Sequence, residues 1–276
     1  MASADPSLSV LVLAGRRAGA LDPLAERAGT SHKCLVPIGG RPLIEHVLLA
    51  LDAAPEVAAV IVSIDDLGVL DHLPAVQALR AQGRLRVTPA QPNLADSILV
   101  AAEEARFPLL VTTADNVLFT PEALAAMASE VRRTGAEIAA AFARKDAVLA
   151  AHPDGQRRFY AFADDAYSNC NCYWIGSREA LSAANIFRSG GQFSNHPMRI
   201  AQAFGLLNLI RFRLGIGSLD AAFAHFSRRL GKRLRPVIFA DGSLAIDVDN
   251  ERTYRVVEQI LARRAAGASL AKKAAA

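Results

Sequence analysis

The 276-residue sequence lacks the features that mark several specialised protein classes. Three cysteines are too few for a disulfide framework, and aromatic residues make up only 6% of the chain. No apolar run approaches about 18 residues, so we expect no membrane-spanning helix. The N-terminus has no basic region before its short apolar run, which is not typical of a secretory signal. We therefore expect a protein of the reducing cytoplasm.

What the chain does contain is typical of a globular enzyme. Hydrophobic residues make up 52% and charged residues 21% of the sequence, which excludes disordered, collagen-like and coiled-coil proteins. The length suits one large domain or two small ones. Because no repeat or linker divides the chain, we predict a single domain over 1–276, with functional halves at 1–145 and 146–250. The low-complexity segment 265–276 is predicted to be a frayed tail.

The first half alternates predicted strands with predicted helices. Its strand segments are continuous apolar runs rather than alternating ones, which indicates a mainly parallel sheet with helices on both faces. The expected fold is therefore a three-layer α/β (αβα), Rossmann-like architecture. The predicted strands are 9–14, 57–64, 85–88 and 108–113, and the predicted helices are 42–53, 67–81, 94–105 and one that begins near residue 120.

The second half contains a basic segment with predicted helices, at about 186–235. This segment contains nine Lys or Arg residues and one acid, Asp220. Such an excess of positive charge suits either an anionic partner or solvated arginines on helix surfaces. The apolar and basic stretch 204–217 could contact a membrane surface, receive a phosphorylated lipid-like acceptor, or form a core helix with arginine edges. Phenylalanines at core-like helical spacing make nucleic acid an unfavoured partner. Further predicted elements are strands 159–162, 172–175 and 236–239, and helices 178–184, 198–209, 219–230 and 251–265.

The most informative motif follows the first predicted strand. Leu13-Ala14-Gly15 leads into Arg16 and Arg17, and Lys33 lies further along the same polar loop. Backbone N–H groups around a glycine can approach a triphosphate closely because glycine has no Cβ atom. The arginines and the lysine can supply cations to it. The stretch is neither a Walker loop nor a dinucleotide-binding glycine motif.

This stretch resembles the signature of the nucleotidyltransferase superfamily with a glycosyltransferase-A-like (GT-A) fold, which includes MobA-like NTP transferases, sugar-1-phosphate nucleotidyltransferases and the cytidylyltransferases of isoprenoid synthesis. Their pattern is a strand, Leu-Ala-Gly-Gly, a loop with an arginine, and Lys-x-Leu-x-x-x-x-Gly-x-Pro-Leu. The second part of the pattern is matched by the segment from Lys33 to Leu43. In the first part, Arg16 replaces the second glycine.

The resemblance implies Mg²⁺-dependent transfer of a nucleoside monophosphate from an NTP to a phosphorylated acceptor, with Mn²⁺ as an alternative ion. It implies a metal ligand at Asp115, after the fourth strand, and a second at Asp247 or Asp249, with Asp247 favoured. Without the resemblance, Asp115 could be a turn residue and the later pair helix caps. The other implied roles are catalytic for Lys33, Arg16 and Arg17, and nucleotide-binding for Leu13, Ala14 and Gly15.

Two further segments fall where relatives contact the base and the acceptor. Asn93, Asp96 and Ser97 precede or open a predicted helix, so they could contact a nucleobase or serve as helix caps. Asn169 and Asn171 lie where relatives place a strand against the acceptor.

Two other functions stay open at this point. A glycosyltransferase of the same general fold would use a nucleotide sugar, but it normally has Asp-x-Asp where this chain has Ala114-Asp115-Asn116. A nucleotide-binding regulatory protein without turnover would be consistent with Arg16 at the glycine position. The sequence does not specify the base, the acceptor or the oligomeric state.

Overall fold

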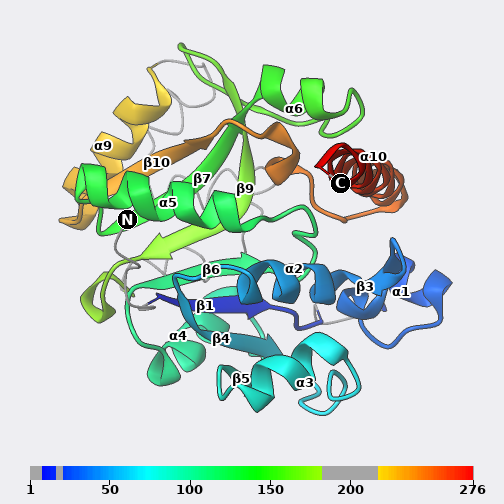
Figure 1. Ribbon diagram of the computed structural model, residues 1–276. Coiled ribbons are helices and arrows are strands. Elements are labelled where there is room, and N and C mark those ends of the chain that lie inside the picture. The colour runs from blue at the N-terminus through cyan, green and yellow to red at the C-terminus, as the bar shows by residue number, and fades with distance from the viewer. Residues whose placement is uncertain (1–7, 17–20, 182–216, 276) are drawn as a thin grey trace.

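A computed structural model describes residues 8–16, 21–181 and 217–275. Its centre is an eight-stranded sheet with the strand order β10-β7-β9-β6-β1-β4-β5, and β8 pairs with β9 (Figure 1). The strands are β1 (Leu8–Leu13), β4 (Val57–Ile64), β5 (Leu85–Pro89), β6 (Leu109–Thr113), β7 (Ile138–Arg144), β8 (Tyr160–Ala161), β9 (Ala166–Ile175) and β10 (Leu234–Phe239). A separate short hairpin joins β2 (Pro37–Ile38) to β3 (Arg41–Pro42).

Most neighbouring strands are parallel, which confirms the predicted fold class. The strand β1 pairs in parallel with β4 on one side and with β6 on the other. The strand β9 is the exception, because it runs antiparallel between β6 and β7. The chain therefore leaves β1 toward β4 and β5, then returns to its other side at β6. Ligands of such sheets bind outside the carboxyl ends of the strands at this change of direction.

Helices cover both faces of the sheet. Alternate residues of β1 point to opposite faces: Val10 and Val12 pack in a large core with α2, α3, α5 and α10, whereas Leu11 packs with α4. A third, smaller cluster lies between α9 and the β7–β9–β10 region. The helices are α1 (Pro23–Ala28), α2 (Leu43–Asp52), α3 (Pro74–Ala81), α4 (Leu94–Glu104), α5 (Pro121–Thr134), α6 (Lys145–Ala151), α9 (Leu219–Leu230) and α10 (Glu251–Ala275).

Several elements differ from the sequence prediction. The helix α1 lies inside the segment predicted as a loop, where Asp22 accepts a hydrogen bond from the backbone N–H of Leu24 and Gly29 ends the helix at φ 64°. The helix α10 continues to Ala275, beyond the predicted end of this helix at residue 265. The predicted helix 198–209 and most of the basic segment lie outside the described residues.

Candidate active site

The site lies where β1 and β6 end side by side. The backbone N–H of Ala114 donates to the carbonyl of Leu13 at 3.0 Å, which joins the two loops that follow these strands. Asp115 is the next residue after Ala114, and its carbonyl accepts a hydrogen bond from the N–H of Val248 at 3.1 Å. This backbone contact brings the segment before α10 to the edge of the sheet where β1 and β6 end.

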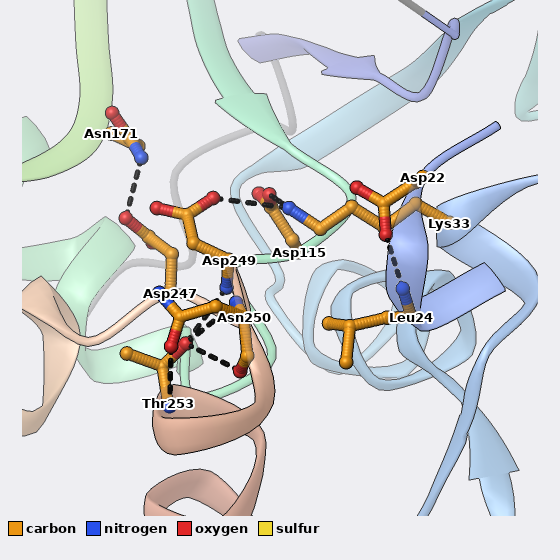
Figure 2. Close-up of polar contacts among 9 residues, drawn as sticks. All are labelled: Asp22, Leu24, Lys33, Asp115, Asn171, Asp247, Asp249, Asn250 and Thr253. Atoms are coloured by element: carbon orange, nitrogen blue, oxygen red, sulfur yellow. Dashed lines mark hydrogen bonds and ion pairs between the residues drawn. The ribbon is translucent and has the colours of Figure 1, made fainter. Parts of the chain in front are cut away.

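Lys33 joins the early loop to two distant acids. It begins the short 3₁₀ helix Lys33–Leu35, and its Nζ lies 2.5 Å from Asp115 Oδ2 and 3.0 Å from Asp249 Oδ1 (Figure 2). Burial alone would lower the pKa of Lys33, but the charges and hydrogen bonds of Asp115 and Asp249 outweigh it and raise the pKa. The ammonium therefore stays protonated at neutral pH.

The carboxylates of Asp115 and Asp247 have opposite electrostatic environments. Burial opposes ionisation of Asp115, but the Lys33 ammonium outweighs this effect and lowers the pKa of Asp115. Burial raises the pKa of Asp247 well above its usual value, and the negative charges of Asp115 and Asp249 raise it further. Asp247 is only 4% exposed, so its carboxylate is a buried group with too little positive charge around it.

The unsatisfied oxygens of these two acids fit a divalent cation. Asn171 Nδ2 donates to Asp247 Oδ2 at 2.6 Å, while Asp247 Oδ1 and Asp115 Oδ1 are buried without a hydrogen-bond partner in the described structure. Asp249 is different, because its side chain is 51% exposed and paired with Lys33. In the part of the chain that is described, no group of three or more His, Cys, Asp or Glu could hold a metal ion. Mg²⁺ needs only one or two carboxylates when substrate phosphates complete its shell.

The glycine loop is held by an acid that the sequence analysis did not single out. Asp65, directly after β4, accepts from the backbone N–H of Arg16 at 2.9 Å and from its Nε at 2.5 Å. Burial would raise the pKa of Asp65, but these hydrogen bonds lower it. The ring of His32, almost fully buried, lies 3.3 Å from the same carboxylate. The sequence signal that could have identified Asp65 was its position directly after a predicted strand. Arg17, the other arginine of this loop, lies outside the described residues.

Gly15 is required by close packing. A Cβ atom at this position would lie 2.5 Å from the Cβ of Ala90, in the loop after β5. The loops after β1 and β5 therefore touch. Leu13 and Ala14 lead into this contact from the end of β1.

The predicted base-contacting residues lie around the start of α4. Asn93 is its N-cap: Oδ1 accepts from the N–H of Asp96, and Nδ2 donates to the Asp96 carboxylate at 2.6 Å. Ser97 is buried, and its Oγ accepts from the N–H of Gln91 at 2.8 Å. Asn93 thus has the capping role that the sequence left open.

Asn169 and Asn171 both lie on β9 and contact each other. Asn169 also donates to the Tyr173 hydroxyl, and Asn171 reaches Asp247. The strand therefore approaches the acidic cluster directly. A further buried amide that the sequence analysis missed is Asn116, whose Nδ2 donates to Thr112 Oγ1 and to the carbonyl of Cys170.

The described part of the basic segment is partly paired. Lys232 lies 3.4 Å from Glu137, and Arg233 donates to the carbonyl of Gly135. These contacts lie at the amino ends of β7 and β10, at the edge of the sheet opposite to Lys33. In the described structure, no helix is both long and apolar enough to cross a membrane.

The structure is thus an α/β protein with a mainly parallel sheet and with a lysine and three aspartates at its topological switch point, the place where sheets of this kind bind ligands. Residues 10–211 match the MobA-like NTP transferase domain, and the chain belongs to this family. The expected family is therefore confirmed.

Solved structures agree with this assignment. A hypothetical transferase from Thermus thermophilus is 25% identical with a TM-score of 0.72, over 89% of this chain and 98% of that one. CMP:2-keto-3-deoxy-manno-octonic acid synthetase complexed with CTP is similar in fold (19% identity, TM-score 0.55, 94% and 100% coverage). So is 4-diphosphocytidyl-2C-methyl-D-erythritol synthase from Anaerococcus prevotii (10% identity, TM-score 0.55, 92% and 95% coverage). A search of curated protein sequences gives no match. The family and these folds support a nucleotidyltransferase-like activity.

Proposed function

We propose that the protein transfers a nucleoside monophosphate from an NTP to a phosphorylated acceptor and releases pyrophosphate. The observation that carries this proposal is the meeting of Lys33 with Asp115 and Asp249, which are 82 and 216 positions away in the sequence. A cation beside a cluster of acids suits a reaction in which phosphate charge must be both bound and balanced.

Asp115 and Asp247 are the proposed ligands of Mg²⁺, or of Mn²⁺ in its place. The support is their pair of buried, unpartnered oxygens, Asp115 Oδ1 and Asp247 Oδ1. A divalent ion bound there would neutralise phosphate charge and orient the substrate. The role of Asp249 is then to hold Lys33, which lies 3.0 Å away.

The remaining steps rest on the chain's own groups. The acceptor phosphate oxygen would attack the α-phosphorus in line, and the Lys33 ammonium would balance the charge that builds on the leaving pyrophosphate. Arg16 would add to this balance by exchanging its contact with Asp65 for the phosphates, and Arg17 is a further candidate cation. No covalent enzyme intermediate is needed. The nearby thiol of Cys34 is a poor nucleophile, because burial raises its pKa to about 12.

The proposed substrate positions follow the edge of the sheet. The NTP would lie along Leu13, Ala14 and Gly15, with its base toward Asp96 and Ser97. The acceptor, a phosphorylated small molecule or a lipid-like phosphate, would approach from the side of Asn169.

The test is pyrophosphate release from each NTP, with a panel of phosphorylated acceptors and with or without Mg²⁺. Lys33→Ala and Asp115→Ala should each lower the rate by about 10²–10³-fold, the usual cost of one preorganised charge-stabilising group. Lys232→Ala is the matched control, because it removes a lysine paired with Glu137 at the opposite edge of the sheet. Full activity in Lys33→Ala or Asp115→Ala would refute the role of that residue, and loss of activity in Lys232→Ala would show that the effect is not local.

A further inference from the structure

The strand β9 is distorted beside the acidic cluster. Ala140 of β7 pairs with Tyr173 and Phe142 pairs with Asn169, so one intervening residue of β7 faces three of β9. Asn171 is the middle residue of these three, and its φ is 46°. In the described structure, Asn171 is the only residue other than glycine with a positive φ. Such bulges redirect a side chain, and they are frequent next to active sites.

The bulge directs Asn171 at Asp247. Its Nδ2 donates to Asp247 Oδ2 at 2.6 Å, and Figure 2 shows the amide pointing down at this carboxylate, with Lys33 to the right beyond Asp249. The carboxylate is left with Oδ1, which is buried and has no hydrogen-bond partner in the described residues. One oxygen of Asp247 is therefore fixed by an amide, and the other is free for a ligand.

The orientation of the Asn171 amide is set by Asn169, two residues earlier on β9. Asn169 Oδ1 accepts from the Asn171 backbone N–H at 3.2 Å, and Asn169 Nδ2 donates to Asn171 Oδ1 at 3.3 Å. If the Asn171 amide were reversed, its Nδ2 would lie against Asn169 Nδ2, so that two donors would face each other. Its Oδ1 would then lie against the Asp247 carboxylate. The network therefore specifies which end of the amide faces Asp247.

We propose that Asn171 is a positioning residue that holds the Asp247 carboxylate so that its Oδ1 faces a bound divalent cation. This inference rests on the proposed function, because it assumes a metal ion at Asp247. It assigns Asn171 a role different from acceptor contact, which stays with Asn169. Outer partners of metal ligands usually contribute about 10–100-fold in metal affinity.

The test is direct binding of Mn²⁺ alone, followed by the loss of the free-ion electron paramagnetic resonance signal. Asn171→Gly removes the amide and keeps a residue that adopts a positive φ without strain. It should weaken Mn²⁺ binding by at least about tenfold. Cys172→Ala is the matched control, because it alters the next buried side chain of the bulge and leaves the Asn171 amide in place. Its affinity should stay within about twofold of the original chain, and circular dichroism would confirm that each variant is folded.

A double-mutant cycle with Asp247→Asn separates positioning from general damage. If Asn171 acts through Asp247, Asn171→Gly should cause no further loss of Mn²⁺ affinity once Asp247 is replaced. Additive losses, unchanged Mn²⁺ affinity in folded Asn171→Gly, an equal loss in Cys172→Ala, or no Mn²⁺ binding by the original chain would each overturn the inference. A separate measurement of pyrophosphate release distinguishes failure of the positioning role of Asn171 from failure of the proposed transfer reaction. Mn²⁺ binding that depends on Asn171 in a chain that releases no pyrophosphate would support positioning and refute the transfer reaction.

Discussion

Replacing Lys33 by methionine should destabilise the protein in a way that depends on pH. The substitution keeps a long unbranched side chain and removes the charge between Asp115 and Asp249. The Lys33 and Asp115 side chains are 21% and 18% exposed, whereas Asp249 is 51% exposed. Most of the loss should therefore come from the pair with Asp115.

The expected loss follows from the geometry of that pair. At 2.5 Å the direct attraction between Lys33 and Asp115 is about 7 kcal/mol for an effective dielectric constant near 20, and the desolvation of both groups offsets much of it. Removing one partner of a buried pair typically costs about 3–5 kcal/mol. Because both groups keep some solvent contact, we expect about 3 kcal/mol, with less than about 1 kcal/mol more from Asp249. The melting temperature should fall by roughly 6–12 °C.

The sign of the pH dependence follows from the pKa of Asp115. With Lys33 present this pKa is lowered, so ionised Asp115 stabilises the fold at neutral pH, and this contribution is lost as the pH falls through the acidic range. Without Lys33, burial would dominate and raise the pKa. Ionised Asp115 would then destabilise the variant at pH 7. As the pH falls, protonation of Asp115 would remove this destabilisation. The stability gap between the two chains should therefore shrink from pH 7.5 toward pH 4.5.

Urea unfolding and thermal melting at matched ionic strength would measure this gap. Lys232→Met is the control, because its partner Glu137 lies 3.4 Å away in a partly exposed pair, and it should cost less than about 1 kcal/mol. A Lys33→Met gap below about 1 °C at pH 7.5, or one that is constant with pH, would refute the reasoning.

Three further predictions concern packing, capping and ligand binding. Gly15→Ala should lower the free energy of unfolding by about 1–3 kcal/mol, because the new Cβ would meet that of Ala90 at 2.5 Å, and Ala90→Gly in the same chain should restore part of the loss in urea unfolding. Thr253→Val should cost about 1 kcal/mol in the same assay, because Thr253 Oγ1 accepts from the backbone N–H of Asp249 and of the next residue; a loss near zero would contradict this role. At least one NTP with Mg²⁺ should raise the melting temperature of the original chain and not of Asp247→Asn, and equal shifts in both chains would exclude Asp247 from the site.

Continuous apolar runs made much of the first half of the fold predictable. The strands β1, β4, β5 and β6 lie where such runs occur, since a buried parallel strand needs apolar side chains on both faces. The strand β7 was missed because Ile138–Arg144 is mostly alanine, which has a high helix propensity and little β-propensity. Its small buried side chains suit a strand with neighbours on both sides. The helix α1 was missed although Asp22-Pro23 and Gly29 gave ordinary start and stop signals.

The site could be predicted only in part. The motif that begins at Lys33 and the two acidic segments identified the candidate site residues. The family resemblance was the reason to expect these residues in one site. Neither spacing nor periodicity could show that Lys33 contacts Asp115 and Asp249, since that contact depends on the tertiary path of the chain. The bulge at Asn171 was equally hidden, because a left-handed asparagine in a strand has no local signature beyond the residue type.

The backbone bond from Val248 to Asp115 has a consequence for synthesis of the protein. Lys33 and Asp115 leave the ribosome well before Asp247 and the residues that cap α10. Sheet pairing around β1 can start on a nascent chain, whereas the acidic cluster can be completed only after the segment before α10 has been made. Chains that stop before Asp247 would therefore lack the cluster, and ligand affinity at this edge would distinguish them from chains that include it.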